Sequence, residues 1–235
     1  MDCKEIKNSD ELKELLFSFS DTEYKAFQLS LIPGYECDRM IGVRVPILRK
    51  IASGISKTEY AKDFLNTLPQ EYYEEYLIHA FLINGLRSYS QTIDALEAFL
   101  PHVDNWACCD ALSPASFKKK DNKEDLTENI KRWLKSERTY TVRFALGMMM
   151  KFFLDGSFSP EFPDLASKIK SDEYYINMMI GWYFATGLAK RYSDFVTFLE
   201  NRLLSPAAHN MTVRKARESF RISNEQKEYL KSLKI

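Results

Sequence analysis

Trp106 and Asp110 are the residues of this sequence whose types and spacing best fit chemistry. Side chains four residues apart share one face of a helix, so an indole and a carboxylate can meet the same substrate group. A fixed carboxylate stabilises positive charge that develops in a reaction, and the face of an indole attracts cations. Each residue also has an ordinary explanation, because a tryptophan often packs between helices and an aspartate is often solvated or caps a helix.

Two groups of cationic side chains have the chemistry to hold phosphate groups. They are Arg214, Lys215, Arg217 and Arg221, and the run Lys118, Lys119 and Lys120 that follows the Asp110 segment. Solvated helix faces are the alternative reading of both groups. Lys and Arg number 33, as do Asp and Glu, so the formal net charge is zero. That balance counts against tight nucleic-acid binding, although a local basic stripe can bind phosphate on a neutral chain.

The histidines and cysteines give no signal for a metal or a disulfide. The three histidines lie far apart, with no Cys or carboxylate at ligand spacing. Adjacent Cys108 and Cys109 cannot easily bridge each other, and no histidine lies nearby in the sequence to activate either thiol. We therefore predict no metal and no cofactor, and we expect these two cysteines to be reduced packing residues.

Helical periodicity runs through the chain from residue 10 onward, without the sustained alternation of a strand. In segment 71–86 the residues expected on one buried face are Tyr73, Leu77, Ala80, Phe81 and Asn84. Glu71, Glu74 and Glu75 lie early in that helix, where carboxylates complement the positive end of the helix dipole. Segment 142–153 repeats the pattern. Aromatic residues make up 14% of the chain, so we expect large rings to pack between helices.

A short element recurs along the second half of the chain. Residues 141–145 read Thr-Val-Arg-Phe-Ala and residues 212–216 read Thr-Val-Arg-Lys-Ala, a shift of 212 − 141 = 71 positions. Two steps of about 35 residues predict an intermediate copy near 176–180, and such a period is typical of paired-helix repeats. Pro and Gly residues limit each helix to roughly 10–16 residues. We predict an all-α fold, an α-solenoid of HEAT-like antiparallel helix pairs (an α–α superhelix), forming one domain over residues 1–235.

The chain has no window approaching the roughly 18 apolar residues that would span a bilayer, and its N-terminus has no apolar signal region. We expect no membrane partner and a cytoplasmic location. We also expect a monomer.

Several motifs together resemble one known family. Leu31-Ile32-Pro33-Gly34 is followed by the segment 40–52, which reads Met-Ile-Gly-Val-Arg-Val-Pro-Ile-Leu-Arg-Lys-Ile-Ala. This looks like the opening of the HEAT-like DNA alkylation repair glycosylases of the AlkD type, where an Ile-Pro loop precedes a Gly-Val-Arg-x-Pro-x-Leu-Arg helix start. The resemblance continues through segments 73–76 and 103–110, the Arg143 helix and Ile180-Gly181-Trp182. It covers nearly the whole chain in order.

The resemblance implies a cleft built from Trp106, Asp110, Arg143 and Trp182. The implied reaction is hydrolysis of the N-glycosidic bond of cationic N3- or N7-alkylated purines, with the damaged base left in the duplex. Asp110 would stabilise the oxocarbenium-like sugar and position water, while the two indoles would face the cation. Arg143 would hold a phosphate or keep Asp110 ionised. The alternative for Arg143 is structural, since HEAT-type repeats often use an arginine to bond the neighbouring repeat.

The sequence departs from the family on the helix that carries the second tryptophan. Cationic positions of the family are occupied here by Asn177, Met178 and Ala185. Each lost phosphate contact weakens DNA binding. The leading hypothesis is a DNA repair glycosylase whose partner is duplex DNA carrying alkylated bases. The alternative is a non-catalytic HEAT-like scaffold that binds protein or an unusual nucleic-acid structure.

Overall fold

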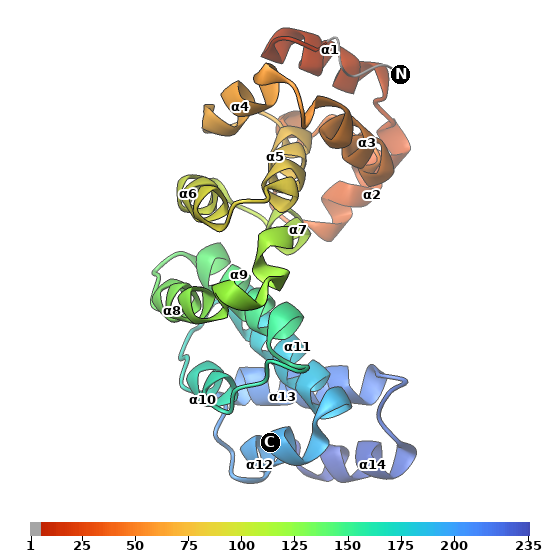
Figure 1. The fold of residues 1–235 in the computed structure, drawn as a ribbon. Helices are drawn as coiled ribbons and strands as arrows, with labels where there is room; N and C mark the ends of the chain where they lie inside the picture. Colours follow the sequence, from red (N-terminus) through yellow and green to blue (C-terminus); the bar gives the residue numbers. More distant parts are fainter. Residues whose placement is uncertain (1–5) are drawn as a thin grey trace. The chain divides into compact units, whose positions relative to one another are not determined.

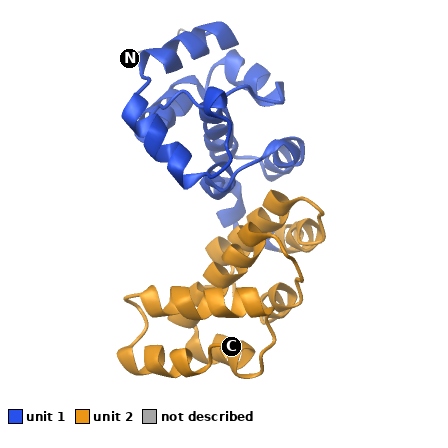
Figure 2. Cartoon of the chain, turned by 180° about the vertical axis from the view of Figure 1, so that it is seen from behind, with its two compact units in different colours: residues 1–123 blue, residues 124–235 orange. Residues whose placement is uncertain are grey.

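The computed structural model describes residues 6–235, and every regular element in that range is a helix (Figure 1). The contacts divide the chain into two compact units, residues 1–123 and 124–235 (Figure 2), called unit 1 and unit 2 below. The all-α, solenoid-like fold of short helices is therefore confirmed. The extent of a single domain over residues 1–235 stays a prediction. Among the described residues, no helix combines the length and the apolar character needed to cross a membrane.

Within its described residues, from 6 to 123, unit 1 contains seven α-helices joined by turns and loops. The α-helices are α1 (Ser9–Ser18), α2 (Thr22–Leu31), α3 (Val45–Ile55), α4 (Glu59–Asn66), α5 (Tyr73–Gly85), α6 (Tyr89–Phe99) and α7 (Trp106–Ala111). Short 3-10 turns are η2 (Cys37–Arg39), η3 (Leu100–His102), η4 (Ala115–Lys118) and η5 (Lys120–Asn122). Helix α5 packs against α3, α4, α6 and α7, so it is the central helix of this unit.

Burial of α5 corrects one expectation from the sequence. Ten of its thirteen residues are buried, so the helix is covered on nearly all sides rather than along one face. Phe81 and Asn84, expected on the buried face, are only half-buried. The single-face prediction was wrong because it assumed a solvated opposite side, whereas neighbouring helices surround α5.

Glu74 is a buried carboxylate at the start of α5, with only 1% of its surface exposed. Its two oxygens accept hydrogen bonds from the backbone N–H groups of Ile41 (3.0 Å), Gly42 (2.7 Å) and Val43 (3.1 Å). Gly42 has a φ of +100°, and a Cβ there would lie 2.6 Å from the carbonyl oxygen of Asp21. The loop before α3 is thus shaped by a charge that pairs with three successive amides.

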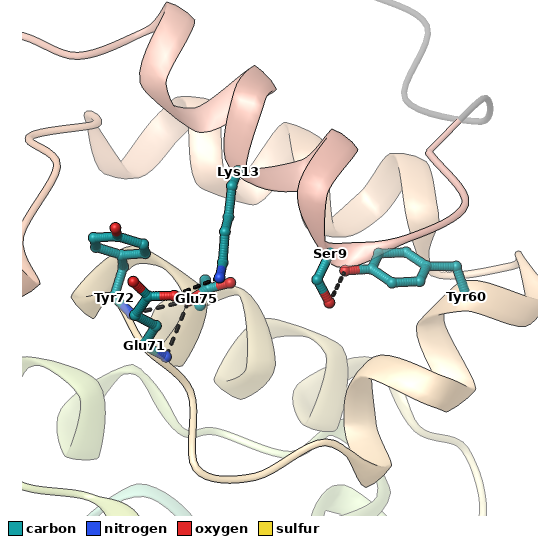
Figure 3. Close-up of polar contacts among 6 residues, drawn as sticks. All are labelled: Ser9, Lys13, Tyr60, Glu71, Tyr72 and Glu75. Carbon is teal, nitrogen blue, oxygen red and sulfur yellow. Dashed lines mark hydrogen bonds and ion pairs between the residues drawn. The ribbon is translucent and has the colours of Figure 1, made fainter.

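An ion pair also links α1 to the segment just before α5 (Figure 3). Lys13 forms an ion pair with Glu71, and this hydrogen bond raises the pKa of Lys13. Glu75 accepts from the N–H groups of Tyr72 (2.9 Å) and Glu71 (3.1 Å), which caps the helix. Burial raises the pKa of Glu75. The acidic residues therefore act through specific bonds as well as through the helix dipole.

Unit 2 contains α8 (Lys123–Trp133), α9 (Thr139–Phe152), α10 (Glu161–Ser167), α11 (Tyr174–Lys190), α12 (Tyr192–Glu200), α13 (Pro206–Glu218) and α14 (Asn224–Ser232). Helix α11 packs against both α9 and α13. These three helices carry the recurring element predicted at 141–145, 176–180 and 212–216, so the repeat corresponds to neighbouring, packed helices. Gly181 permits the close approach of α11 and α13, because a Cβ there would lie 2.8 Å from the Cβ of Met211.

Aromatic rings fill the core of unit 2, as their abundance predicts. Phe195 of α12 lies edge-on to Tyr183 and Phe184 of α11, with ring centroids 5.6 and 5.5 Å apart. All three side chains are fully buried. Edge-to-face contacts of this kind add stabilisation beyond the area that they bury.

We predict that Glu74→Ala lowers the free energy of unfolding by about 3 kcal/mol, because three backbone N–H groups lose their acceptor. Urea unfolding of the purified protein measures this change. The control is Glu59→Ala, which removes an exposed carboxylate paired only with exposed Lys62 and should change the stability by less than about 0.5 kcal/mol. Equal losses in the two variants would contradict the role given to Glu74.

His79 makes the stability of the protein depend on pH. The ring is fully buried, stacks on Phe99 with centroids 4.4 Å apart, and burial lowers its pKa from 6.5 to about 3. Below pH 6.5 His79 is protonated in the unfolded chain but stays neutral in the folded chain. The free energy of unfolding therefore falls as the pH falls towards 3. The loss approaches about 1.4 kcal/mol per pH unit. In His79→Leu, denaturant unfolding between pH 7 and 4 should show a correspondingly shallower pH dependence; an unchanged slope would contradict this.

Candidate functional site

Helix α7 presents Trp106 and Asp110 from the same short element. Trp106 is its first residue and Asp110 lies in its last turn, and both side chains are half-buried. The indole Nε1 of Trp106 donates to the carbonyl oxygen of Leu31 at 3.0 Å. This bond fixes the ring plane against the end of α2. The structure thus places the two residues on one helix with the expected spacing.

A chain of polar contacts fixes the beginning of α7. Asn105 caps the helix by accepting from the Cys108 N–H at 2.9 Å, and its amide donates to Asp104 at 2.9 Å. Asp104 in turn pairs with Arg39 of η2 at 2.7 Å. The Arg39 guanidinium also lies 5.3 Å from the Tyr35 ring centroid. The position of Trp106 therefore depends on the loop between α2 and α3.

The sequence did not indicate the roles of Arg39 and Tyr35 in this loop. Arg39 has no periodic pattern around it, and its partner Asp104 is far away in the sequence. The Ile32-Pro33-Gly34 motif at the start of the loop does not indicate which helix the loop contacts. Burial raises the pKa of the Tyr35 hydroxyl in the same loop, so that tyrosine is neutral.

The far end of α7 is closed by Asn84 of α5. Its amide donates to the carbonyl of Ala111 at 2.8 Å, and its oxygen accepts from the Ser113 N–H at 2.6 Å. Cys108 and Cys109 are buried between these ends, and burial raises the pKa of the Cys108 thiol. A protonated, buried thiol is a packing group rather than a nucleophile.

Arg143, in unit 2, is buried, with 4% of its surface exposed. Its Nη1 donates to the carbonyl oxygen of Tyr175 at 3.0 Å, which links α9 to the beginning of α11. This contact is the one expected from a structural arginine that bonds the next repeat. Its role towards a substrate stays a prediction.

Trp182 lies on a pocket of about 320 Å³ formed by α11, α13 and the turn that follows. The indole is 40% exposed, and the Lys215 ammonium lies 5.9 Å from its ring centroid. Arg221 and Glu218 line the same pocket. The structure therefore brings together an aromatic face and two of the predicted phosphate-binding cations.

The remaining predicted cations are on the surface. Arg214 and Arg217 are exposed on α13, and Lys118 is exposed at the end of η4. Lys119 is exposed and donates to the carbonyl oxygen of Arg87 at 3.1 Å. Exposed cations are available to phosphate groups and equally to solvent.

Two of the three non-cationic positions on α11 are buried in this chain. Asn177 is 3% exposed and Ala185 is 6% exposed, while Met178 is half-buried. Asn177 donates to the carbonyl of Ser171 at 2.7 Å and accepts from the Ser205 hydroxyl at 3.1 Å. Asn177 thus joins α11 to the start of α13, a packing role that its sequence position did not reveal.

Over residues 6–235 no group of three or more His, Cys, Asp or Glu side chains is arranged to hold a metal ion. His79 and His209 are both fully buried. His209 Nε2 lies 2.9 Å from the carbonyl oxygen of Leu233, so this ring is engaged in packing α14. The prediction that no metal or cofactor takes part is not tested by these contacts.

The fold defines a protein built from repeated helix pairs, and its motifs resemble those of DNA repair enzymes. A family model described as DNA alkylation repair enzyme matches residues 12–220. Because this range spans most of the chain, the protein belongs to the DNA alkylation repair enzyme family. A comparison with curated proteins gives no match. The resemblance drawn from the sequence motifs is confirmed at the level of the family.

We predict that Arg143→Gln lowers the free energy of unfolding by roughly 2 kcal/mol, because buried Arg143 loses its charged hydrogen bond to the carbonyl of Tyr175. The matched control is Arg214→Gln, the equivalent position of the last copy of the repeat, where the side chain is exposed. That variant should change stability by less than about 0.5 kcal/mol. Thermal or urea unfolding compares the two, and similar values for both would argue against the structural role.

Proposed function

We propose that the protein is a monofunctional DNA glycosylase that removes cationic N3- or N7-alkylated purines from duplex DNA. Family membership supports a role in DNA alkylation repair. The main support for glycosylase activity is helix α7, where Trp106 and Asp110 are both half-buried. Hydrogen bonds hold this short helix at both ends. A carboxylate kept partly accessible, beside an indole, suits a substrate that is itself a cation.

Asp110 is the proposed catalytic carboxylate. In the reaction the bond between the sugar C1′ and the base nitrogen breaks, and the bonding electron pair leaves with the base, which becomes neutral. The sugar carbon becomes cationic, as in glycoside hydrolysis. The Asp110 carboxylate stabilises that charge and orients a water molecule, which adds to C1′ and releases a proton. No cofactor is required for this balance.

Unit 2 supplies the proposed contacts to DNA. The Trp182 ring offers a stacking face, and Lys215 and Arg221 beside it carry charge for backbone phosphates. Exposed Arg214 and Arg217 extend the cations along α13. Lys118 and Lys119 offer the same chemistry in unit 1. Arg143 is assigned mainly to holding α9 and α11 together, on the strength of its buried bond to Tyr175.

The alternative is a non-catalytic HEAT-like scaffold that binds protein or an unusual nucleic-acid structure. Two observations favour it: the formal net charge is zero, and Arg143 is engaged in packing. A scaffold of this kind would need neither Asp110 nor the accessible Trp106. Base release from alkylated DNA separates the two proposals.

We predict that the protein releases 7-methylguanine or 3-methyladenine from alkylated duplex DNA at low salt, and that Asp110→Asn slows release by about 100-fold or more. Single-turnover assays with chromatographic detection of the free base measure this. Asp121→Asn removes the same charge from an exposed residue of unit 1 and should leave the rate unchanged. Background release by both wild-type protein and Asp110→Asn would sink the enzyme proposal.

A further inference from the structure

Unit 1 contains a cleft of about 820 Å³ at the C-terminal ends of α3 and α5. Its cationic lining residues are Arg49, Lys57 and Arg87, and Ser53 and Ser56 add hydroxyl groups. The volume falls in the range of pockets that hold small organic ligands. Asn84, which also bonds to the end of α7, lines part of it, but none of the residues proposed above for catalysis or DNA binding does.

The charges of this cleft have one sign. No carboxylate lines it, and within residues 6–235 none of its three cations forms an ion pair. Elsewhere in unit 1 the comparable cations Lys13, Arg39 and Arg44 each pair with a carboxylate. Three unpaired positive charges around one concavity raise the local potential, which favours an anion.

The geometry of Arg49 is suited to holding that anion. Its guanidinium lies over the Phe81 ring, 4.2 Å from the centroid. Stacking on a ring restricts the long side chain while its N–H groups stay available for a bidentate contact with phosphate. The apolar part of the wall, including Leu65 and Leu82, gives a flat ligand group a surface to lie on.

The cleft also adjoins a cation predicted to contact nucleic acid. Lys119 donates to the carbonyl of Arg87, so its ammonium lies next to the backbone of a lining residue. We propose that this cleft binds the phosphate group of a nucleotide, with Arg49, Lys57 and Arg87 contacting the phosphate oxygens. The nucleotide is either free or part of a strand, and both sources share this chemistry.

The test compares two double variants that remove equal charge from unit 1. Arg49→Gln with Arg87→Gln alters the cleft, whereas Lys50→Gln with Lys62→Gln removes exposed cations that do not line it. Titration calorimetry at low salt measures binding of thymidine 3′,5′-bisphosphate and of a short undamaged duplex. We expect the cleft variant to bind at least ten times more weakly than wild type, and the control to stay within about twofold.

The two probes distinguish the sources of the phosphate. Binding of the bisphosphate indicates a free nucleotide. Binding of the duplex alone indicates that the phosphate belongs to a DNA strand. The slope of log K against log salt concentration should then be smaller in magnitude by about two in the cleft variant, because two phosphate contacts are lost. Lys57→Gln serves as a second variant. Lys57 does not stack on Phe81, so this variant should keep its fold even if the Arg49 substitution causes the first variant to unfold.

The proposal is overturned if wild-type protein binds neither probe, or if the cleft variant and the control bind alike. The assay uses undamaged DNA and measures no base release. A protein that fails to excise alkylpurines can therefore still pass it, so its outcome is separate from that of the glycosylase proposal.

Discussion

The buried carboxylate of Glu74 organises the part of the chain that carries α7. It stands on α5, the central helix of unit 1, and draws three amides of the 41–43 loop onto the helix start. The end of α2 contacts α7 through the Leu31 carbonyl on Trp106, and Arg39 of the loop pairs with Asp104 just before α7. Because the buried Glu74 side chain would lose three hydrogen bonds if the loop moved, it restricts the loop that precedes α3.

Unit 2 uses a different principle, in which side chains of one repeat bond to the next. Arg143 of α9 reaches the carbonyl of Tyr175, and Asn177 of α11 meets the Ser205 cap of α13. The equivalent Arg214 of α13 is exposed. The same Thr-Val-Arg motif therefore gives a packing arginine in one copy and a surface cation in another.

The sequence predicted the helical class, the repeat and the presence of Trp106 and Asp110 on one helix, because periodicity and spacing along a helix are local properties. It did not predict which sides of α5 are covered, since burial depends on helices distant in the chain. The bonds of Arg39, Glu74 and Asn177 were not predicted for the same reason: their partners lie far from them in the sequence or are backbone groups. Polar residues of this kind are recognised only once the packing is known.

The zero net charge of the chain says less about DNA than it first suggests. Some acidic side chains are held in specific bonds: buried Glu74 accepts from backbone amides, and the more exposed Asp21 and Asp104 pair with Arg44 and Arg39. The cations around Trp182, and those of the cleft that includes Arg49, lie in places with few or no carboxylates. Phosphate responds to the local field within about a Debye length, not to the sum over the chain. A protein with no net charge can therefore still present local basic surfaces to a nucleic acid.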